Sequence, residues 1–242
     1  MIFKLEVIGF NIVSCINAEN AGAHRIELCD NPEEGGTTPS YGFIKAAREK
    51  LQIDLYPIIR PRGGDFLYSD AEFEMMKADI KICKDLDCDG VVIGMLRANG
   101  SVDKERCKEL VELAYPLGVT FHRAFDRVND ASKALEDIIE IGCERILTSG
   151  LQPFAMNGAE LIFSLIKQAD ERIIIMPGSG VRKDNIVKLV KKTGAIEFHT
   201  SARTLLKSKM NYNNELMSKN LSSVTVNEDE IKIIIELLHQ YR

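Results

Sequence analysis

Three short segments decide the fold of this chain: Gly90–Met95 reads GVVIGM, Gly118–His122 reads GVTFH and Arg145–Ser149 reads RILTS. Each is an apolar, partly β-branched run that predicts a buried strand, and a segment with helical periodicity follows it. Similar runs begin at Lys4, His24, Asp54, Arg172 and Ile196. Successive runs start 20 to 36 residues apart, which is the spacing that a strand, a crossover helix and two loops require.

The eight repeats predict an α/β protein with a single (β/α)8 barrel of the TIM type. An open doubly wound sheet is the alternative, but it usually has a GxGxxG turn after its first strand. Here Gly9-Phe10-Asn11 stands at that place. We therefore expect one domain over residues 1–242, with the strand and helix repeats in 1–203. Residues 204–242 are expected to form a surface tail, polar and without a strand over Leu205–Glu228, and a final helix over Asp229–Gln240.

Capping residues indicate where several of the helices begin and end. Ser69 and Asp130 each precede a helical segment and are residue types that accept hydrogen bonds from the first free backbone N–H groups. Asp184 is the corresponding candidate for the segment before Gly194. Gly142 and Gly194 stand where a left-handed residue ends a helix.

The composition excludes several classes of protein. Lysine and arginine number 31 against 36 aspartate and glutamate, a net charge of −5 without a basic cluster, which argues against a nucleic acid partner. The apolar runs are far shorter than the roughly 20 residues of a membrane-spanning helix, and the first residues lack the features of a signal peptide. We expect a cytoplasmic protein with no membrane partner. Its six cysteines form no CxxC pair, so their spacing predicts no zinc or redox site.

Polar side chains collect where the predicted strands end, which is the face of such a barrel that carries chemistry. The candidates for catalysis by proton transfer are Glu6, Glu27, His122, Asp126 and His199. The two histidines have a structural alternative as core residues with one backbone partner, and the two glutamates as part of a layer of ion pairs that lines the barrel. Both interpretations stay open. The predicted strand exits contain no lysine, which disfavours Schiff-base chemistry.

A second group of residues predicts a site for a small anion. Loops after strands seven and eight of these barrels often bind phosphate through backbone N–H groups, and glycines let the backbone approach an anion closely. The residues expected to contact the anion or substrate are Arg60, Arg62, Asp65, Arg123, Ser149, Gly178, Ser179, Gly180 and Ser201. Arg203 adds to the positive charge near this mouth, although the whole chain is acidic.

Several longer motifs resemble the CutC copper homeostasis family. They are RIELC (25–29), EGGTTPS (34–40), YPIIRPRGGDFLYSDAEF (56–73), GVTFHRAFD (118–126), RILTSG (145–150), PGSGV (177–181) and FHTSAR (198–203). The resemblance implies a cytoplasmic TIM-type barrel that forms a homo-oligomer, a dimer or higher, and handles Cu(I). By matching motif it places in the pocket Glu6, Glu27, Arg60, Arg62, Asp65, His122, Arg123, Asp126, Ser149 and His199, and it indicates Cys29 as the copper-binding cysteine. Leu96–Val102 departs from the family pattern.

The residues and the resemblance favour different functions. Cu(I) prefers thiolate or thioether ligands, whereas the strand exits offer Cys29, with Met95 and Met176 as distant candidates. A Cu(I) site shared across an oligomer interface, or one of low affinity, stays open. The alternative is a lyase-like or isomerase-like enzyme that acts on a small phosphorylated or carboxylated substrate, without an organic cofactor. A structural or interaction protein is a third class, and the density of polar residues on one face argues against it.

Overall fold

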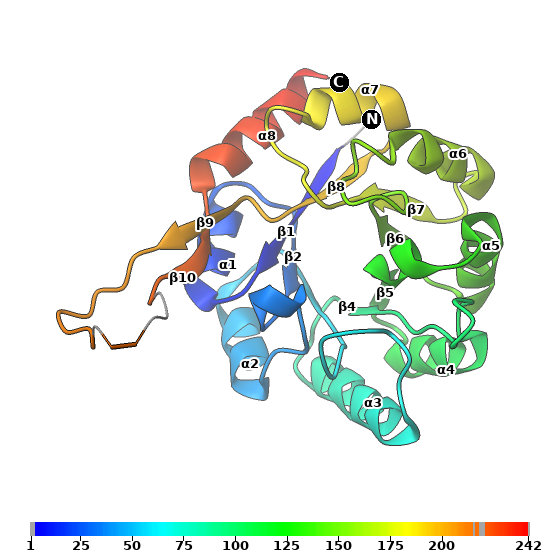
Figure 1. The fold of residues 1–242 in the computed structure, drawn as a ribbon, viewed down its shortest axis with the longest axis horizontal. Helices are drawn as coiled ribbons and strands as arrows, with labels where there is room; N and C mark the ends of the chain where they lie inside the picture. The colour runs from blue at the N-terminus through cyan, green and yellow to red at the C-terminus, as the bar shows by residue number, and fades with distance from the viewer. Residues whose placement is uncertain (1–2, 215, 218–220, 242) are drawn as a thin grey trace.

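Parallel strands form a ring that is enclosed by helices (Figure 1). The computed structural model describes residues 3–214, 216–217 and 221–241. The strands of the ring are β1 (Lys4–Gly9), β2 (Arg25–Leu28), β3 (Asp54–Pro57), β4 (Gly90–Ile93), β5 (Gly118–Phe121), β6 (Arg145–Thr148), β7 (Ile174–Pro177) and β8 (Glu197–Thr200). The helices are α1 (Ile12–Asn20), α2 (Tyr41–Lys50), α3 (Asp70–Asp85), α4 (Lys104–Ala114), α5 (Ala131–Ile141), α6 (Ala159–Ala169), α7 (Ile186–Thr193) and α8 (Glu228–Gln240). Two short 3-10 helices span Pro32–Glu34 and Arg123–Arg127.

The ring consists of two parallel four-stranded sheets, ordered β3-β2-β1-β8 and β4-β5-β6-β7. A parallel bridge between Ile58 and Val92 joins β3 to β4, and β7 lies beside β8 at the second seam. The predicted (β/α)8 barrel is therefore confirmed. Its register is important for the site, because Glu6 of β1 pairs with Arg25 on one side and with His199 on the other.

Most of the predicted caps are present. The Ser69 hydroxyl accepts from the backbone N–H of Glu72, whose carboxylate accepts from the backbone N–H of Ser69 in return, which completes a capping box. Asp130 caps α5, and Gly142 ends that helix with φ 95°. The prediction for Asp184 was wrong. Helix α7 begins at Ile186 instead, because the Asn185 side chain bonds the Arg182 N–H and the Gly180 carbonyl and so fixes the turn before the helix.

Side chains of the barrel strands alternate between two cores. One set packs outward against the helices in a large apolar core that includes Leu5, Ile26 and Phe121. The other set points inward, and its small apolar part consists of Ile8, Cys29, Tyr56, Ile58 and Val92. Because the strand period is two, Glu6 is on the same face of β1 as Ile8, and Glu27 is on the same face of β2 as Cys29. The barrel interior is therefore charged as well as apolar.

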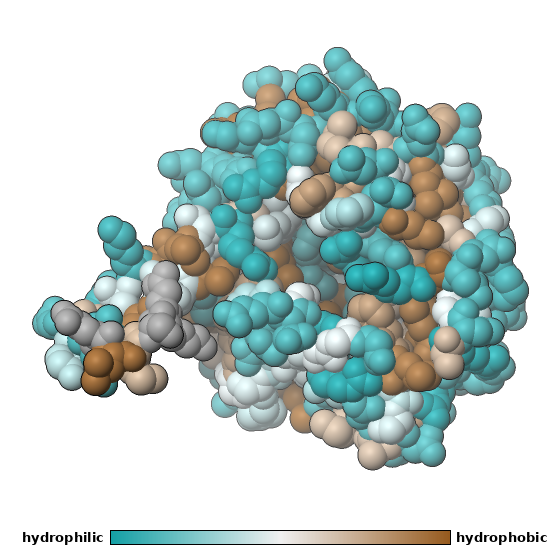
Figure 2. Space-filling view, in the orientation of Figure 1, coloured by the Kyte–Doolittle hydropathy of each residue, from teal (hydrophilic) through white to brown (hydrophobic). Residues whose placement is uncertain are grey.

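The prediction of a strandless tail was wrong. β9 (Arg203–Leu206) and β10 (Ser223–Val226) form an antiparallel hairpin that projects from the barrel beside α1 (Figure 1). The SVTV run of β10 is β-branched and alternating, which is a strand pattern that the polar surroundings obscure. Apolar side chains gather on this arm (Figure 2). They include Leu205, Leu206, Met210, Tyr212, Leu216, Met217 and Leu221, all exposed.

Within the described ranges, every helix is too short or too polar to cross a membrane.

Candidate functional site

A pocket of about 250 Å³ opens at the carboxyl ends of the barrel strands. Its lining comes from strand ends and the loops that follow them, as the predicted face requires. The lining residues are Ile8, Glu27, Gly35, Ile58, Arg60, Phe66, His122, Arg123, Leu147, Ser179, Gly180, His199, Ser201 and Arg203. Two groups that can exchange a proton, Glu27 and His199, therefore share one pocket with three arginines.

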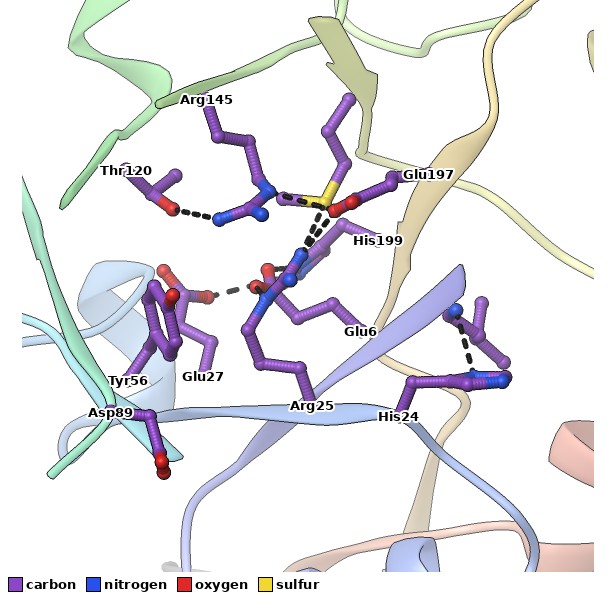
Figure 3. Close-up of polar contacts among 12 residues, drawn as sticks. Glu6, His24, Arg25, Glu27, Tyr56, Asp89, Thr120, Arg145, Glu197 and His199 are labelled. Carbon is purple, nitrogen blue, oxygen red and sulfur yellow. Dashed lines mark hydrogen bonds and ion pairs between the residues drawn. The ribbon is translucent and has the colours of Figure 1, made fainter. Parts of the chain in front are cut away.

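His199 is held between two carboxylates inside the barrel (Figure 3). Its Nδ1 lies 2.7 Å from Glu6 Oε1, and its Nε2 lies 3.8 Å from Glu27 Oε2. The Arg25 guanidinium donates to the other oxygen of Glu6 at 2.5 Å. Glu6 is thereby fixed as the acceptor for Nδ1, and the opposite edge of the ring faces Glu27 at the pocket.

A layer of buried ion pairs supports this arrangement from the side of the amino ends of the strands. Arg25 and Arg145 both donate to Glu197 at 2.7 Å. Arg145 also bonds the Thr120 hydroxyl at 3.2 Å and the Glu144 carboxylate at 2.7 Å. Figure 3 shows Arg25, Thr120, Arg145 and Glu197 converging from β2, β5, β6 and β8. The structural alternative of an ion-pair layer is thus present, and it lies directly beneath the His199 cluster.

The two carboxyl groups beside His199 have very different pKa values. Burial raises the pKa of Glu27 from 4.5 to about 7, against the opposing effect of His199. Burial would also raise the pKa of Glu6, but the charge of Arg25 and the hydrogen bond from His199 outweigh it and lower that pKa to about 2. Burial would lower the pKa of His199, whereas Glu6 and Glu27 raise it above 6.5. Glu6 is therefore a fixed anion at neutral pH, while Glu27 is poised to take up or release a proton.

His122 lies at the pocket in a different environment. Its Nδ1 accepts a hydrogen bond from the backbone N–H of Ala124 at 3.1 Å, and its ring packs against Phe66 with 5.0 Å between centroids. Burial, assisted by the charge of Arg60, lowers its pKa from 6.5 to about 3. His122 is accordingly a neutral imidazole at physiological pH.

Three arginines and a tight turn provide the positive side of the pocket. The Arg60 guanidinium is anchored by the carbonyls of Glu34, Gly36 and Gly64, at 2.7 to 2.9 Å. Arg203 stacks on the Phe10 ring at 5.0 Å. In the turn after β7, Ser179 and Gly180 have φ values of 75° and 71°, so successive backbone N–H groups can be presented toward the pocket.

Some predicted residues lie behind the pocket wall or outside it. Asp126 accepts from the Thr148 hydroxyl and the Ser149 N–H and pairs with Arg123 at 2.7 Å, so it orients that arginine. Other predicted residues also lie outside the lining: Glu6, Cys29, Arg62, Asp65, Ser149 and Gly178. Arg62 pairs with Asp65 at 2.9 Å and with Glu72 at 2.6 Å, on the surface of the loop that leads into α3.

The sequence reasoning missed Arg25, Arg145, Glu197 and Phe66. The first three stand at the start of their strands, and each comes two residues before a residue that lines the pocket: Arg25 before Glu27, Arg145 before Leu147 and Glu197 before His199. Since alternate residues of a strand share a face, this spacing of two was a usable signal. Phe66 is in a loop, and no pattern in the sequence marks it.

The CutC family model matches residues 3–204. The chain belongs to the CutC family. The family protein CutC of Parabacteroides distasonis is 50% identical over 239 residues, covering 96% of this chain and 98% of that protein. The human copper homeostasis protein cutC homolog is 46% identical over 96% of this chain and 84% of its own length.

Solved structures agree with this family and with its fold. CutC from Streptococcus agalactiae is 34% identical and superposes with a TM-score of 0.79, covering 83% of this chain and 99% of that one. Phosphoribosylanthranilate isomerase from Thermotoga maritima is 11% identical over 99% of this chain, with a TM-score of 0.61. At that identity the isomerase supports the barrel fold alone.

The relatives are named for copper homeostasis, so the ligand atoms of this CutC chain can be compared with those that copper prefers. Among the described residues, Glu6, Glu27 and His199 form the one group of three potential ligand residues whose ligand atoms are close enough to hold a metal ion. Two carboxylates and an imidazole are hard or intermediate donors, which suit divalent ions better than Cu(I). Cys29 is fully buried beside Glu27, and burial together with the charge of Glu27 raises the pKa of its thiol, which disfavours the thiolate that Cu(I) would need.

Proposed function

We propose that this CutC chain is an enzyme that binds a small phosphorylated or carboxylated molecule at the barrel mouth and transfers a proton with Glu27. The observation that carries the proposal is the pairing of Glu27, whose pKa is about 7, with His199 at the base of an arginine-lined pocket. A general base works best when its pKa is near the operating pH. Arg60, Arg123 and Arg203 provide the charge that attracts and holds an anion.

In this reaction the residues have separate roles. Glu27 accepts a proton from the substrate, and the nearby imidazolium of His199 stabilises the carboxylate form of Glu27 between turnovers. Glu6 keeps the His199 ring oriented and acts only through it. The volume of about 250 Å³ fits a small metabolite better than a nucleotide cofactor.

The test combines a ligand screen with a proton-exchange assay. Phosphorylated sugars and small carboxylates are incubated with the protein in D2O, and loss of each C–H signal is followed by NMR together with the thermal shift. We expect at least one compound to raise Tm and to exchange a proton, and Glu27→Gln to reduce exchange at least 100-fold. Arg203→Met should weaken binding, while Arg97→Met, at a residue that does not line the pocket, should not. A screen with no thermal shift and no exchange would refute the proposal.

Copper binding is a second candidate, which the names of the relatives and the position of Cys29 beside the Glu6, Glu27 and His199 group support. An anaerobic Cu(I) competition titration tests it with Cys29→Ser beside Cys107→Ser, a matched buried cysteine in α4. Tight binding that only Cys29→Ser abolishes would support Cu(I) chemistry at the barrel. Weak binding that neither change affects would refute it.

We further propose that the chain acts in the cytoplasm as a homo-oligomer, with the β9–β10 arm docked on a second copy. Residues 203–214 contain three cations, Arg203, Lys207 and Lys209, and no acidic residue, so the rest of the chain carries a net charge of −8. A basic, apolar arm is complementary to the acidic surface of another copy.

Light scattering on chromatographically separated protein measures the mass and so tests this assembly. We expect an oligomer that Leu206→Asp dissociates and that Phe163→Asp, an exposed control position on α6, leaves intact. A monomer at all concentrations would contradict the assembly.

A further inference from the structure

Two buried donors in the pocket lining have no acceptor among the residues that the structure describes: Nε2 of His122 and Nε of Arg60. The tautomer of His122 follows from its neighbour, because Nδ1 accepts the Ala124 N–H and so carries no proton of its own. The ring proton is therefore on Nε2. Buried donors normally have partners, so an unpartnered pair in one pocket calls for a ligand.

Both groups contact the same aromatic ring, and the charge of Arg60 acts on His122. The ring of Phe66 packs against His122, and the Arg60 guanidinium lies over that same ring at 5.1 Å. Three backbone carbonyls anchor the terminal nitrogens of Arg60, and the buried Tyr68 hydroxyl lies beside its guanidinium. Gly94 provides the space for the imidazole, since a Cβ at position 94 would overlap the ring of His122.

We infer that His122 and Arg60 form a donor pair that binds the carbonyl or carboxylate oxygen of the substrate, so that the substrate is a small anionic carbonyl compound with an acidic neighbouring C–H. This inference rests on the proposed function and names its substrate class. A neutral imidazole can donate a hydrogen bond to a developing oxyanion without giving up its proton. The guanidinium of Arg60 adds a permanent positive charge beside it.

The proton transfer then balances as follows. Glu27 takes the proton from the carbon next to the carbonyl, and the C–H bond pair becomes a carbon–carbon π bond. The carbonyl π pair moves onto oxygen, and the resulting enolate is held by the two N–H groups. The proton on Glu27 exchanges with solvent, and Glu27 then returns a solvent-derived proton to this carbon as the carbonyl re-forms, which gives hydrogen exchange. No oxidant, reductant or second substrate is consumed.

The experiment uses the full chain labelled with 15N-histidine, and oxalate as the probe because it is a planar mimic of an enediolate. We expect the Nε2–H signal of His122 to move on addition of oxalate. We also expect His122→Phe, which keeps a ring but removes both nitrogens, to weaken oxalate binding at least tenfold. His122→Gln places an amide N–H near the position of Nε2 and should recover most of the affinity. Circular dichroism confirms that each variant is folded.

Orthophosphate binding and the Glu27-dependent exchange assay separate this inference from the proposed function. If orthophosphate binds and Glu27→Gln abolishes exchange, but oxalate binds equally to wild type and His122→Phe, the donor pair is refuted and the proposed function stands. If oxalate fails to bind the wild type, the donor pair is also refuted. If His122→Phe weakens oxalate binding but no carbon acid exchanges its proton in the presence of wild type, the oxygen subsite stands and the proton-transfer function fails.

Discussion

Replacing Arg25 with methionine should destabilise the fold by about 3–5 kcal/mol at pH 7, because it leaves the buried Glu6 carboxylate without its arginine and removes one of the two arginines that bind Glu197. Arg25 is 1% exposed, and it donates to Glu6 at 2.5 Å and to Glu197 at 2.7 Å. The pKa of Glu6 reflects the same cation together with His199. The difference between 4.5 and about 2 corresponds to roughly 3 kcal/mol, which is the net effect of Arg25 and His199 against burial.

The pH dependence of this effect has a definite direction. A carboxyl whose pKa is lowered in the folded state stabilises the fold above its unfolded pKa, and this stabilisation is lost as pH falls from about 4.5 toward 2. In Arg25→Met the pKa of Glu6 rises, so protonation relieves the uncompensated charge already in mildly acidic solution. The deficit of the variant is therefore largest at neutral pH and shrinks toward pH 4.

Urea unfolding followed by circular dichroism at pH 7 and pH 4.5 measures this deficit. Arg97→Met is the matched control, because the Arg97 side chain is 51% exposed and pairs with Glu105 at the surface. Its replacement should cost less than about 1 kcal/mol. A deficit for Arg25→Met below about 1 kcal/mol at pH 7, or one that is equal at both pH values, would refute the reasoning.

Three further predictions concern the pocket. His122 should stay neutral from pH 5 to 8, because burial lowers its pKa to about 3, whereas the pKa of His199 should lie above its usual 6.5 because Glu6 and Glu27 raise it. A titration of His122 near pH 6.5 in 15N NMR would contradict this. Glu27→Gln should raise the free energy of unfolding by about 1–3 kcal/mol at pH 8 and by much less at pH 5. A carboxyl whose pKa is raised to about 7 stabilises the fold only while it is protonated, and glutamine carries no charge at either pH. Urea unfolding that showed an equal gain at both pH values would contradict this prediction. Gly94→Ala should lower the free energy of unfolding by about 1–3 kcal/mol, because the new Cβ would overlap the His122 ring. Gly42→Ala, in open space on α2, is the control and should be neutral or stabilising. Thermal unfolding of both variants measures the difference.

The barrel could be predicted from the sequence because its signals are local. Runs such as GVVIGM at Gly90–Met95 are apolar throughout, as strands buried on both faces must be, and caps such as Ser69 and Asp130 mark the helices between them. The hairpin was missed because its local sequence signal is weak. β10 consists of four residues, and an arm that packs little against the barrel needs no strong apolar pattern to form.

The site could be predicted in part. The position of Glu27, His122 and His199 at strand ends was sufficient to bring them to one pocket, because parallel strands of a barrel share their carboxyl end. The roles of the charged residues could not be read in the same way. Arg60, Arg62 and Asp126 all follow strands and all bond neighbouring loops, but only Arg60 lines the pocket. The direction of a loop side chain depends on tertiary contacts, which the sequence does not give.

The buried layer of Arg25, Glu197 and Arg145 is hard to explain by stability alone, because replacing such pairs with apolar residues of similar volume is often neutral or stabilising. Its effect is positional. Arg25 keeps Glu6 ionised and in place, so that Glu6 accepts from Nδ1 of His199 and turns the other edge of the ring toward Glu27. One imidazole is thus held between a carboxylate whose pKa is about 2 and a carboxyl whose pKa is about 7. Two carboxyl groups whose pKa values are pushed apart in this way can divide the tasks of orientation and proton transfer between them.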